Sequence, residues 1–279
     1  MSEAMRWNRR ILDFSKKTYV MGILNCTPDS FYPASRHPGT EDAVSLALHM
    51  ADSGVDIIDV GGESTRPGSA DVAAEEEISR ICPVIDKIRL ASDVLISVDT
   101  RSAEVAQRAL TSGADIVNDI SGLKADPAMQ NLVADEGVPV IIMHIRGTPQ
   151  TMQANPYYTD AICEIKAELL ESVDLALRAG VQKRYIVLDP GIGFGKRLED
   201  NVNIIRNLAK LRELGYPLLV GVSRKSFLGQ ILDLPVDERL IGSVTANTIA
   251  VLNGANIVRV HDYCEAIQMV RVVDAVMKN

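Results

Sequence analysis

Eight short apolar runs lie along almost the whole chain, and polar residues follow each of them. The runs cover residues 20–24, 55–60, 94–98, 116–117, 138–143, 186–188, 218–222 and 257–258. Short runs rich in Val, Ile and Leu are typical of parallel strands buried on both faces. The first residues that mark the ends of the eight runs are Asn25, Gly61, Asp99, Asn118, His144, Asp189, Arg224 and Arg259. Because parallel strands gather their carboxyl ends at one edge, the pattern predicts a site built from these endings.

Segments with helical periodicity separate the runs. They cover about 41–53, 72–91, 102–112, 127–136, 157–180, 199–214, 236–253 and 263–277. Eight alternations of strand and helix predict a single (β/α)8 TIM barrel with long βα loops over its carboxyl-terminal mouth, with an open doubly wound sheet as the structural alternative. We expect residues 1–18 to be an N-terminal extension and residues 19–279 to be one catalytic domain.

Particular residues predict where the helices begin and end. Asp126 precedes Pro127, which predicts a capped helix start with proline in the first turn. Glycines that end a helix shortly before the next strand are Gly54, Gly113, Gly137, Gly180, Gly215 and Gly254.

Charge and cysteine content exclude several classes of protein. The net charge of −8 argues against a general nucleic-acid binder, which needs a basic face. The four cysteines are too scattered for a CxxC motif. The longest apolar run, 138–143, is far short of the ~18 residues that span a membrane. With no apolar stretch of signal-peptide length in residues 1–15, we expect a cytoplasmic protein with free thiols and no membrane partner.

A group of cationic residues follows three of the predicted strands. Its members are Arg66, Arg224, Lys225, Arg259 and His261. In an acidic chain, such a cluster favours an anionic ligand such as phosphate or diphosphate. The alternative is that these side chains pair with acidic residues beside them.

Two carboxylates and an amide end three further strands, at Asp99, Asn118 and Asp189. Together they could accept hydrogen bonds from the amino and ring N–H groups of a guanidine-like heterocycle. Alternatively, each could cap the following helix, or the two carboxylates could form an acid–base pair as in glycosidases.

The glycine-rich segment 189–196 does not have the spacing of a nucleoside-triphosphate loop, and Arg197 stands where that loop needs Ser or Thr. We interpret its glycines as allowing a close backbone approach to a flat ligand. No histidine spacing typical of zinc and no nucleophile elbow occurs. Asn25, with Thr27 and Asp29, could supply oxygen ligands to Mg2+ or could simply form a turn. Residues 27–40 and 147–156 read as long loops that could act as lids.

Eight motifs in order resemble the dihydropteroate synthase family of the folate pathway. They lie at 21–31 (MGILNCTPDSF), 59–68 (DVGGESTRPG), 97–100 (SVDT), 118–122 (NDISG), 143–149 (MHIRGTP), 188–196 (LDPGIGFGK), 221–227 (GVSRKSF) and 259–262 (RVHD). The resemblance implies a dimeric (β/α)8 enzyme that is a sulfonamide target. Its implied reaction condenses 6-hydroxymethyl-7,8-dihydropterin diphosphate with para-aminobenzoate, with Mg2+ assistance. Diphosphate departs first, and the arylamine then attacks.

The resemblance also implies a function for individual residues. Pterin binding is implied for Asp99, Asn118, Ile120, Met143, Asp189, Gly221 and Lys225, diphosphate binding for Arg66, Arg259 and His261, the aminobenzoate pocket for Thr65, Pro67, Phe194 and Ser226, and Mg2+ binding for Asn25. The implied catalytic set is Asp99, Asp189, Lys225, Arg259 and His261.

One segment departs from the family pattern. After residue 31 the family commonly continues Ser-Asp-Gly-Gly, whereas this chain reads YPASR over 32–36, which affects the expected closure of the first loop. The altered loop leaves open a non-catalytic pterin-binding protein. A pterin-binding methyltransferase is the rival enzyme, although its reaction expels no diphosphate and has no use for the anion-binding residues.

Overall fold

The computed structural model describes residues 4–7, 10–27, 39–64, 68 and 71–277. Within them, eight parallel strands form one sheet in the order β8-β7-β6-β5-β4-β3-β10-β9. Their bounds are β3 Tyr19–Asn25, β4 Ile57–Gly61, β5 Leu95–Asp99, β6 Ile116–Asp119, β7 Val140–Met143, β8 Ile186–Asp189, β9 Leu219–Val220 and β10 Ile257–Val260.

The sheet closes on itself between β8 and the start of β9. Leu188 forms a parallel bridge with Leu218, and its backbone N–H donates to Pro217 O at 2.9 Å. Closure removes both sheet edges. The predicted (β/α)8 barrel is therefore confirmed, and the open doubly wound sheet is wrong.

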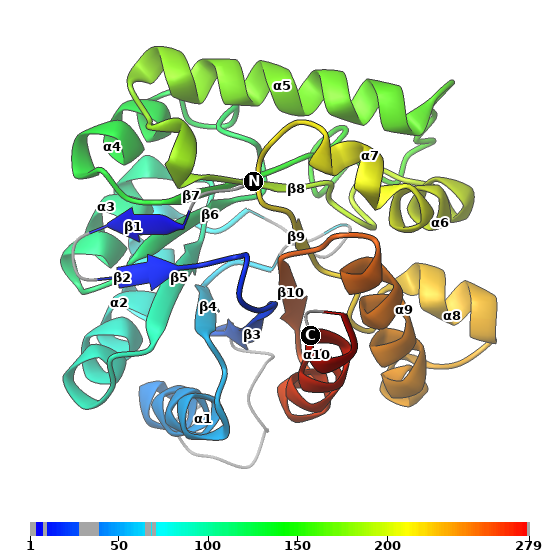
Figure 1. Ribbon diagram of the computed structural model, residues 1–279. Helices are drawn as coiled ribbons and strands as arrows, with labels where there is room; N and C mark the ends of the chain where they lie inside the picture. The colour runs from blue at the N-terminus through cyan, green and yellow to red at the C-terminus, as the bar shows by residue number, and fades with distance from the viewer. Residues whose placement is uncertain (1–3, 8–9, 28–38, 65–67, 69–70, 278–279) are drawn as a thin grey trace.

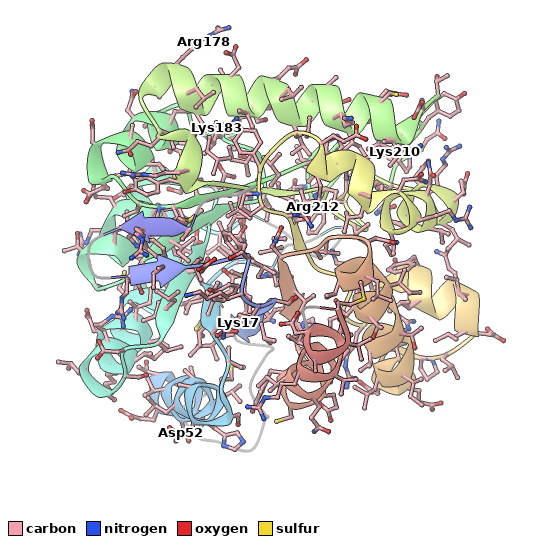
Figure 2. The ribbon with its side chains drawn as sticks, in the orientation of Figure 1. Lys17, Asp52, Arg178, Lys183, Lys210 and Arg212 are labelled. Carbon is pink, nitrogen blue, oxygen red and sulfur yellow. The ribbon has the colours of Figure 1, made fainter. Side chains whose placement is uncertain are left out.

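Helices surround the strands, with α5 along one side of the molecule and α1 on the opposite side (Figure 1). Charged side chains such as Arg178 and Lys210 project from the outer helices (Figure 2). No helix in the described part of the chain is long and apolar enough to span a membrane. The helices are α1 Thr40–Ser53, α2 Ala74–Ala91, α3 Ala103–Thr111, α4 Ala128–Glu136, α5 Ala161–Ala179, α6 Leu198–Arg206, α7 Leu208–Arg212, α8 Ser226–Leu232, α9 Leu240–Leu252 and α10 Tyr263–Met277.

The predicted helix boundaries follow the expected chemistry in most places. Asp126 Oδ1 accepts from Ala128 N at 3.0 Å, at the start of α4. Gly54 and Gly180 end α1 and α5 with φ of +97° and +101°, a conformation that favours glycine. The predicted helix 199–214 is two helices, because the chain leaves helical geometry at Asn207. The short helix α8 was not predicted.

An antiparallel hairpin of β1 (Met5–Trp7) and β2 (Arg10–Leu12) covers the amino-terminal end of the barrel. Met5, Trp7 and Leu12 are almost completely buried in the main core. The Tyr185 hydroxyl, just before β8, donates to Arg6 O at 2.9 Å. Arg10 donates to Asp115, just before β6, at 3.2 Å. The hairpin thus leaves the carboxyl-terminal end as the place for a site.

Candidate active site

The predicted strand-end residues stand beside one another at the carboxyl edge of the barrel. In the sheet register Asn25 pairs with Gly61, Gly61 pairs with Asp99, and Asp99 pairs with Asn118. Asp189 ends β8, next to Met143 at the end of β7. The parallel register therefore brings polar residues from four strands, β3, β5, β6 and β8, to one mouth.

Arg259, on β10, lies between two carboxylates. Its Nε donates to Asp59 Oδ2 and its Nη2 donates to Asp99 Oδ2, both at 2.6 Å. Asn118 Nδ2 also donates to Asp59 Oδ2, at 3.1 Å. Asp59 has no exposed surface, so these bonds satisfy a carboxylate that water cannot reach. Among the described residues, Nη1 of Arg259 has no hydrogen-bond partner and can serve a ligand.

The sequence reasoning did not assign Asp59 to the site. The available signal was a single acidic residue inside the apolar run 55–60, where a buried charge requires a partner. Its partner, Arg259, is 200 residues away in the chain. No local spacing reveals that pair.

Burial controls the ionisation of the two strand-end carboxyls. It raises the pKa of Asp99, while the charge of Arg259 opposes the rise. It also raises the pKa of Asp189, which Lys225 and the N–H of Gly191, 2.7 Å from Asp189 Oδ1, oppose. Each carboxylate is thus costly to keep charged without a donor, and a ligand with N–H groups would supply one.

Lys225 follows β9 in the chain, and its side chain reaches the end of β8 and the loop after β8. Its Nζ donates to Ile192 O and lies 4.6 Å from the centre of the Phe194 ring. Burial lowers the pKa of Lys225 to about 8, and the charge of Asp189 limits the fall. Ser226 begins α8 and is exposed beside Lys225. Lys225 and Phe194 therefore lie together beside the end of β8.

Two glycines of segment 189–196 pack closely against the backbone of the chain after β7. A Cβ on Gly191 would lie 1.9 Å from His144 O, and one on Gly195 would lie 2.3 Å from Arg146 O. Both glycines have positive φ, +67° and +63°. The chain after β7 thus requires glycine at both positions.

A buried lysine fixes the same loop from inside. Lys196 Nζ donates to Phe194 O and to His144 Nδ1, both at 2.9 Å. His144 Nε2 lies 2.9 Å from Glu168 Oε2 on α5. Burial lowers the pKa of His144 to about 4, so the ring is neutral and we infer that Nε2–H donates to Glu168. Lys196 was not predicted as a functional residue.

The cationic cluster expected from the sequence divides into different environments. Arg224 donates to both oxygens of Asp262, at 2.7 and 3.0 Å, and adopts a positive φ of +55°. For Arg224 the alternative holds, because its guanidinium pairs with an acidic neighbour. His261 is exposed and its Nδ1 lies 3.1 Å from the Ser223 hydroxyl.

The remaining residues expected in the site lie near the mouth or fall outside the described part of the chain. Ile120 and Met143 are buried beside the mouth, at 4% exposure each, and Gly221 is buried directly after β9. Residues outside the described part of the chain are Asp29, the altered segment 32–36, Thr65, Arg66 and Pro67.

Asn25 is the described residue that the sequence assigned to Mg2+. It is half-buried at the end of β3, and its side chain makes no hydrogen bond to another described residue. Across residues 4–277, excepting the masked stretches, no group of three or more His, Cys, Asp or Glu forms a metal site. An amide oxygen with no hydrogen bond to the described residues fits a cation that takes most of its ligands from a phosphate substrate and water.

The chain matches known proteins over nearly its whole length. The sequence model of the family described as "Pterin binding enzyme" matches residues 21–261. The dihydropteroate synthase of Synechocystis sp. is 47% identical over 269 residues, covering 96% of this chain and 93% of that protein. The Yersinia pestis dihydropteroate synthase in a sulfonamide complex superposes with a TM-score of 0.93 at 40% identity, covering 99% of this chain and 100% of that one. The Xanthomonas albilineans enzyme with 4-aminobenzoic acid gives 0.93 at 39% identity, covering 100% of both chains.

Proposed function

The chain belongs to the pterin-binding enzyme family, and we propose that it is a transferase with dihydropteroate synthase activity. It condenses 6-hydroxymethyl-7,8-dihydropterin diphosphate with para-aminobenzoate to give 7,8-dihydropteroate and diphosphate. The observation that carries the proposal is the meeting of Asp99, Asp189, Lys225 and Arg259 at one mouth. Two carboxylates and two cations at one mouth suit a ligand that combines a nitrogen-rich ring with an anionic group.

Pterin recognition rests on buried acceptors. Asp99 and Asp189 accept hydrogen bonds from the amino and ring N–H groups, and Lys225 donates to ring acceptors. Asn118 contributes its amide oxygen, since its Nδ2 is bonded to Asp59. Apolar packing and close backbone approach come from Ile120, Met143 and Gly221.

Loss of diphosphate is the step that needs stabilisation. Arg259 has no partner for Nη1 among the described residues, and its guanidinium is already held by two carboxylates, so it stabilises the departing charge without reorganising. His261 and Arg66 assist. The arylamine then attacks the electron-poor pterin methylene, so no protein nucleophile takes part. Thr65, Pro67, Phe194 and Ser226 border the aminobenzoate.

Mg2+ is part of the proposal, with Asn25 as its protein ligand. When bound, the ion neutralises charge on the diphosphate. Asn25 supplies one oxygen, and its freedom from hydrogen bonds to other described residues supports this.

We further propose a homodimer, supported by exposed apolar side chains on α9 and α10. Ile241 is 79% exposed and Leu252 48%, and their spacing of three helical turns puts them on one side of α9. Val272 and Val276, one turn apart on α10, are 64% and 74% exposed. Light scattering tests this directly: a monomer that persists at micromolar concentration contradicts it.

A cytoplasmic location without nucleic-acid or membrane partners completes the proposal. All four cysteines are free thiols, and the net charge is −8. Free thiols support a reducing compartment. The negative net charge argues against a nucleic-acid partner and favours small-molecule substrates.

The deciding experiment follows diphosphate release and dihydropteroate formation together, with Mg2+, in the presence and absence of para-aminobenzoate. Product that depends on aminobenzoate is the expected result. Tight binding of the pterin diphosphate without product would instead identify a non-catalytic protein. Arg259→Ala with unchanged turnover and diphosphate affinity would remove Arg259 from the mechanism.

A further inference from the structure

A buried lysine ties the loop after β8 to the chain just after β7. Lys196 is 3% exposed, and its Nζ donates to Phe194 O and to His144 Nδ1, both at 2.9 Å. The same nitrogen lies 3.4 Å from His144 O. The three N–H groups of the ammonium thus face three protein acceptors, and no donor is left for a substrate.

A line of hydrogen bonds continues from Lys196 to the long helix α5. His144 Nε2 lies 2.9 Å from Glu168 Oε2, and Arg146 Nη2 donates to the other carboxylate oxygen of Glu168. With Nε2–H directed at Glu168, Nδ1 of the neutral ring is an acceptor for Lys196. The position of Lys196 is therefore set by α5 and by the end of β7.

Phe194 connects Lys196 to the proposed pterin site. Its carbonyl oxygen accepts the bond from Lys196, while its ring centre lies 4.6 Å from Lys225 Nζ. Lys225 Nζ also donates to Ile192 O, and a Cβ on Gly193 would lie 3.1 Å from Lys225 Cδ. The three loop residues from Ile192 to Phe194 are thus the surface on which the Lys225 side chain lies.

A buried ammonium is a costly way to hold a loop. Burial lowers the pKa of Lys196 to about 7, and the charge of Asp189 limits the fall. Because apolar residues often replace buried charged groups without loss of stability, stability alone is a weak reason for a lysine here. What the ammonium adds is direction, since its three donors specify one position for Phe194.

We propose that Lys196 is a positioning residue for Lys225, an inference that rests on the proposed function. By bonding Phe194 O, Lys196 holds the Phe194 ring and the nearby Ile192 carbonyl in the arrangement that keeps Lys225 in place. Lys196 acts through the loop and touches no substrate. Without its ammonium the loop relaxes, Lys225 leaves this surface, and the affinity for the pterin diphosphate falls.

The test measures the Kd for 6-hydroxymethyl-7,8-dihydropterin diphosphate by calorimetry, with Mg2+, in the full-length protein. We expect Lys196→Met, which keeps the stem and removes the three donors, to raise the Kd about fivefold or more. Lys196→Arg keeps the charge but puts a planar fork where a compact ammonium fits, so it does not restore the affinity. Lys166→Met is the matched control: it removes one positive charge from a surface pair with Glu213 and leaves the Kd within about twofold of the wild type.

A double-mutant cycle shows whether Lys196 acts through Lys225. If it does, Lys196→Met combined with Lys225→Met has the Kd of Lys225→Met alone. Where Lys225→Met binds too weakly to measure, Lys225→Arg takes its place, because its longer side chain does not fit the same surface. A direct effect of the Lys196 charge on the anionic substrate would instead persist in the Lys225 variant and would spare Lys196→Arg. Either of those results overturns the proposal.

Gln153→Ala keeps the proposal testable if the Lys196 variants do not fold. Gln153 is exposed and its Nε2 donates to Gly193 O at 2.8 Å, so its removal loosens the same loop from the surface. We expect a Kd about threefold higher, with no further increase when Lys225→Met is also present. An unchanged Kd would show that the loop does not position Lys225. A wild-type protein that forms no dihydropteroate contradicts the proposed function, whereas contrary results in an active protein contradict only the assignment of Lys196.

Discussion

Arg259 bonds through Nε to a carboxylate, Asp59, that is buried completely beneath the mouth. The cation proposed to stabilise diphosphate is thus oriented from below, by a strand that lies two positions away in the sheet. Positioning of this kind fixes the guanidinium before any ligand arrives.

Asp59→Asn tests this arrangement. The amide keeps the shape but leaves Arg259 with one carboxylate, Asp99, so we expect kcat to fall about tenfold or more with a modest change in pterin affinity. Removing one member of a buried pair also lowers the free energy of unfolding by about 3 kcal/mol. Urea denaturation and steady-state kinetics measure the two effects. A kcat equal to that of the wild type would show that Asp59 only stabilises the barrel.

The pH dependence of pterin binding follows from Lys225. Its pKa is lowered to about 8, so the ammonium loses its proton as the pH rises through this value, well before an ordinary lysine. We expect affinity for the pterin diphosphate to fall between pH 7 and pH 9. Lys225→Arg stays charged over this range, so its affinity is weaker and lacks the fall above pH 8. Calorimetry at several pH values checks both, and a wild-type affinity constant over this range contradicts the prediction.

Glycine substitutions separate packing from backbone conformation. Gly191 and Gly137 have similar φ values, +67° and +61°, but a Cβ meets His144 O at 1.9 Å in the first case and nothing within 4 Å in the second. Gly137→Ala therefore costs only the left-handed conformation, about 1 kcal/mol. Gly191→Ala must also displace the chain after β7, and we expect at least twice that loss and a higher aminobenzoate KM. Equal costs in denaturation would refute the packing argument.

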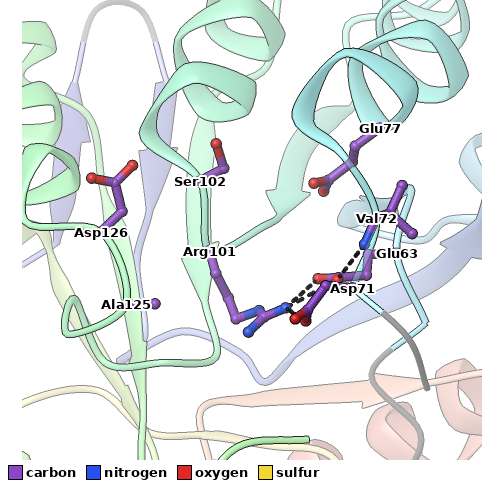
Figure 3. Close-up of a pocket in the computed structure, with 8 residues that line it drawn as sticks. All are labelled: Glu63, Asp71, Val72, Glu77, Arg101, Ser102, Ala125 and Asp126. Atoms are coloured by element: carbon purple, nitrogen blue, oxygen red, sulfur yellow. Dashed lines mark hydrogen bonds and ion pairs between the residues drawn. The ribbon is translucent and has the colours of Figure 1, made fainter. Parts of the chain in front are cut away.

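Glu77, on α2 beside the pocket in Figure 3, predicts a pH-dependent stability. Burial raises its pKa to about 7, and no described residue bonds its Oε1. The folded state thus holds the proton more tightly than the unfolded chain. Stability from this group is complete below about pH 4.5 and is lost as the pH rises through about 7.

Glu77→Gln stays neutral and removes this dependence. We expect it to exceed the wild type at pH 8 by on the order of 3 kcal/mol, with no comparable gain at pH 4.5. Thermal or urea unfolding at both pH values measures the difference. A gain of the same size at both would assign the effect to packing instead of ionisation.

Most of the barrel could be predicted because each strand is a short apolar run that its flanking helix must cover. The strand ends could be predicted for the same reason, since parallel strands share one edge. The hairpin could not, because its three-residue strands contain arginines and gain stability from distant partners such as Asp115 and Tyr185. Helix α8, only seven residues long, carries too little periodicity to be recognised.

The positions of the strand-end residues could be predicted from the sequence, but the pairing of their side chains could not. Asp99, Asn118 and Asp189 lie where the sequence indicates, at the ends of strands. The partners of Arg259 and Arg224 depend on side chains that the folded barrel brings together from far along the chain. The sequence places Lys196 at the end of a glycine-rich segment, and its bond to His144 is visible only in the structure.

The hairpin that covers the amino-terminal end of the barrel restricts where substrates enter and products leave. Since Met5, Trp7 and Leu12 close that end with core side chains, we expect both reactants and both products of the proposed reaction to pass through the carboxyl-terminal mouth. The proposed pterin acceptors Asp99 and Asp189 are buried, whereas Ser226 is exposed, so we expect the acceptor to enter over the pterin and the joined product to leave by the same path. A full-length product left in place therefore obstructs the next turnover, and its departure becomes a natural point of kinetic control.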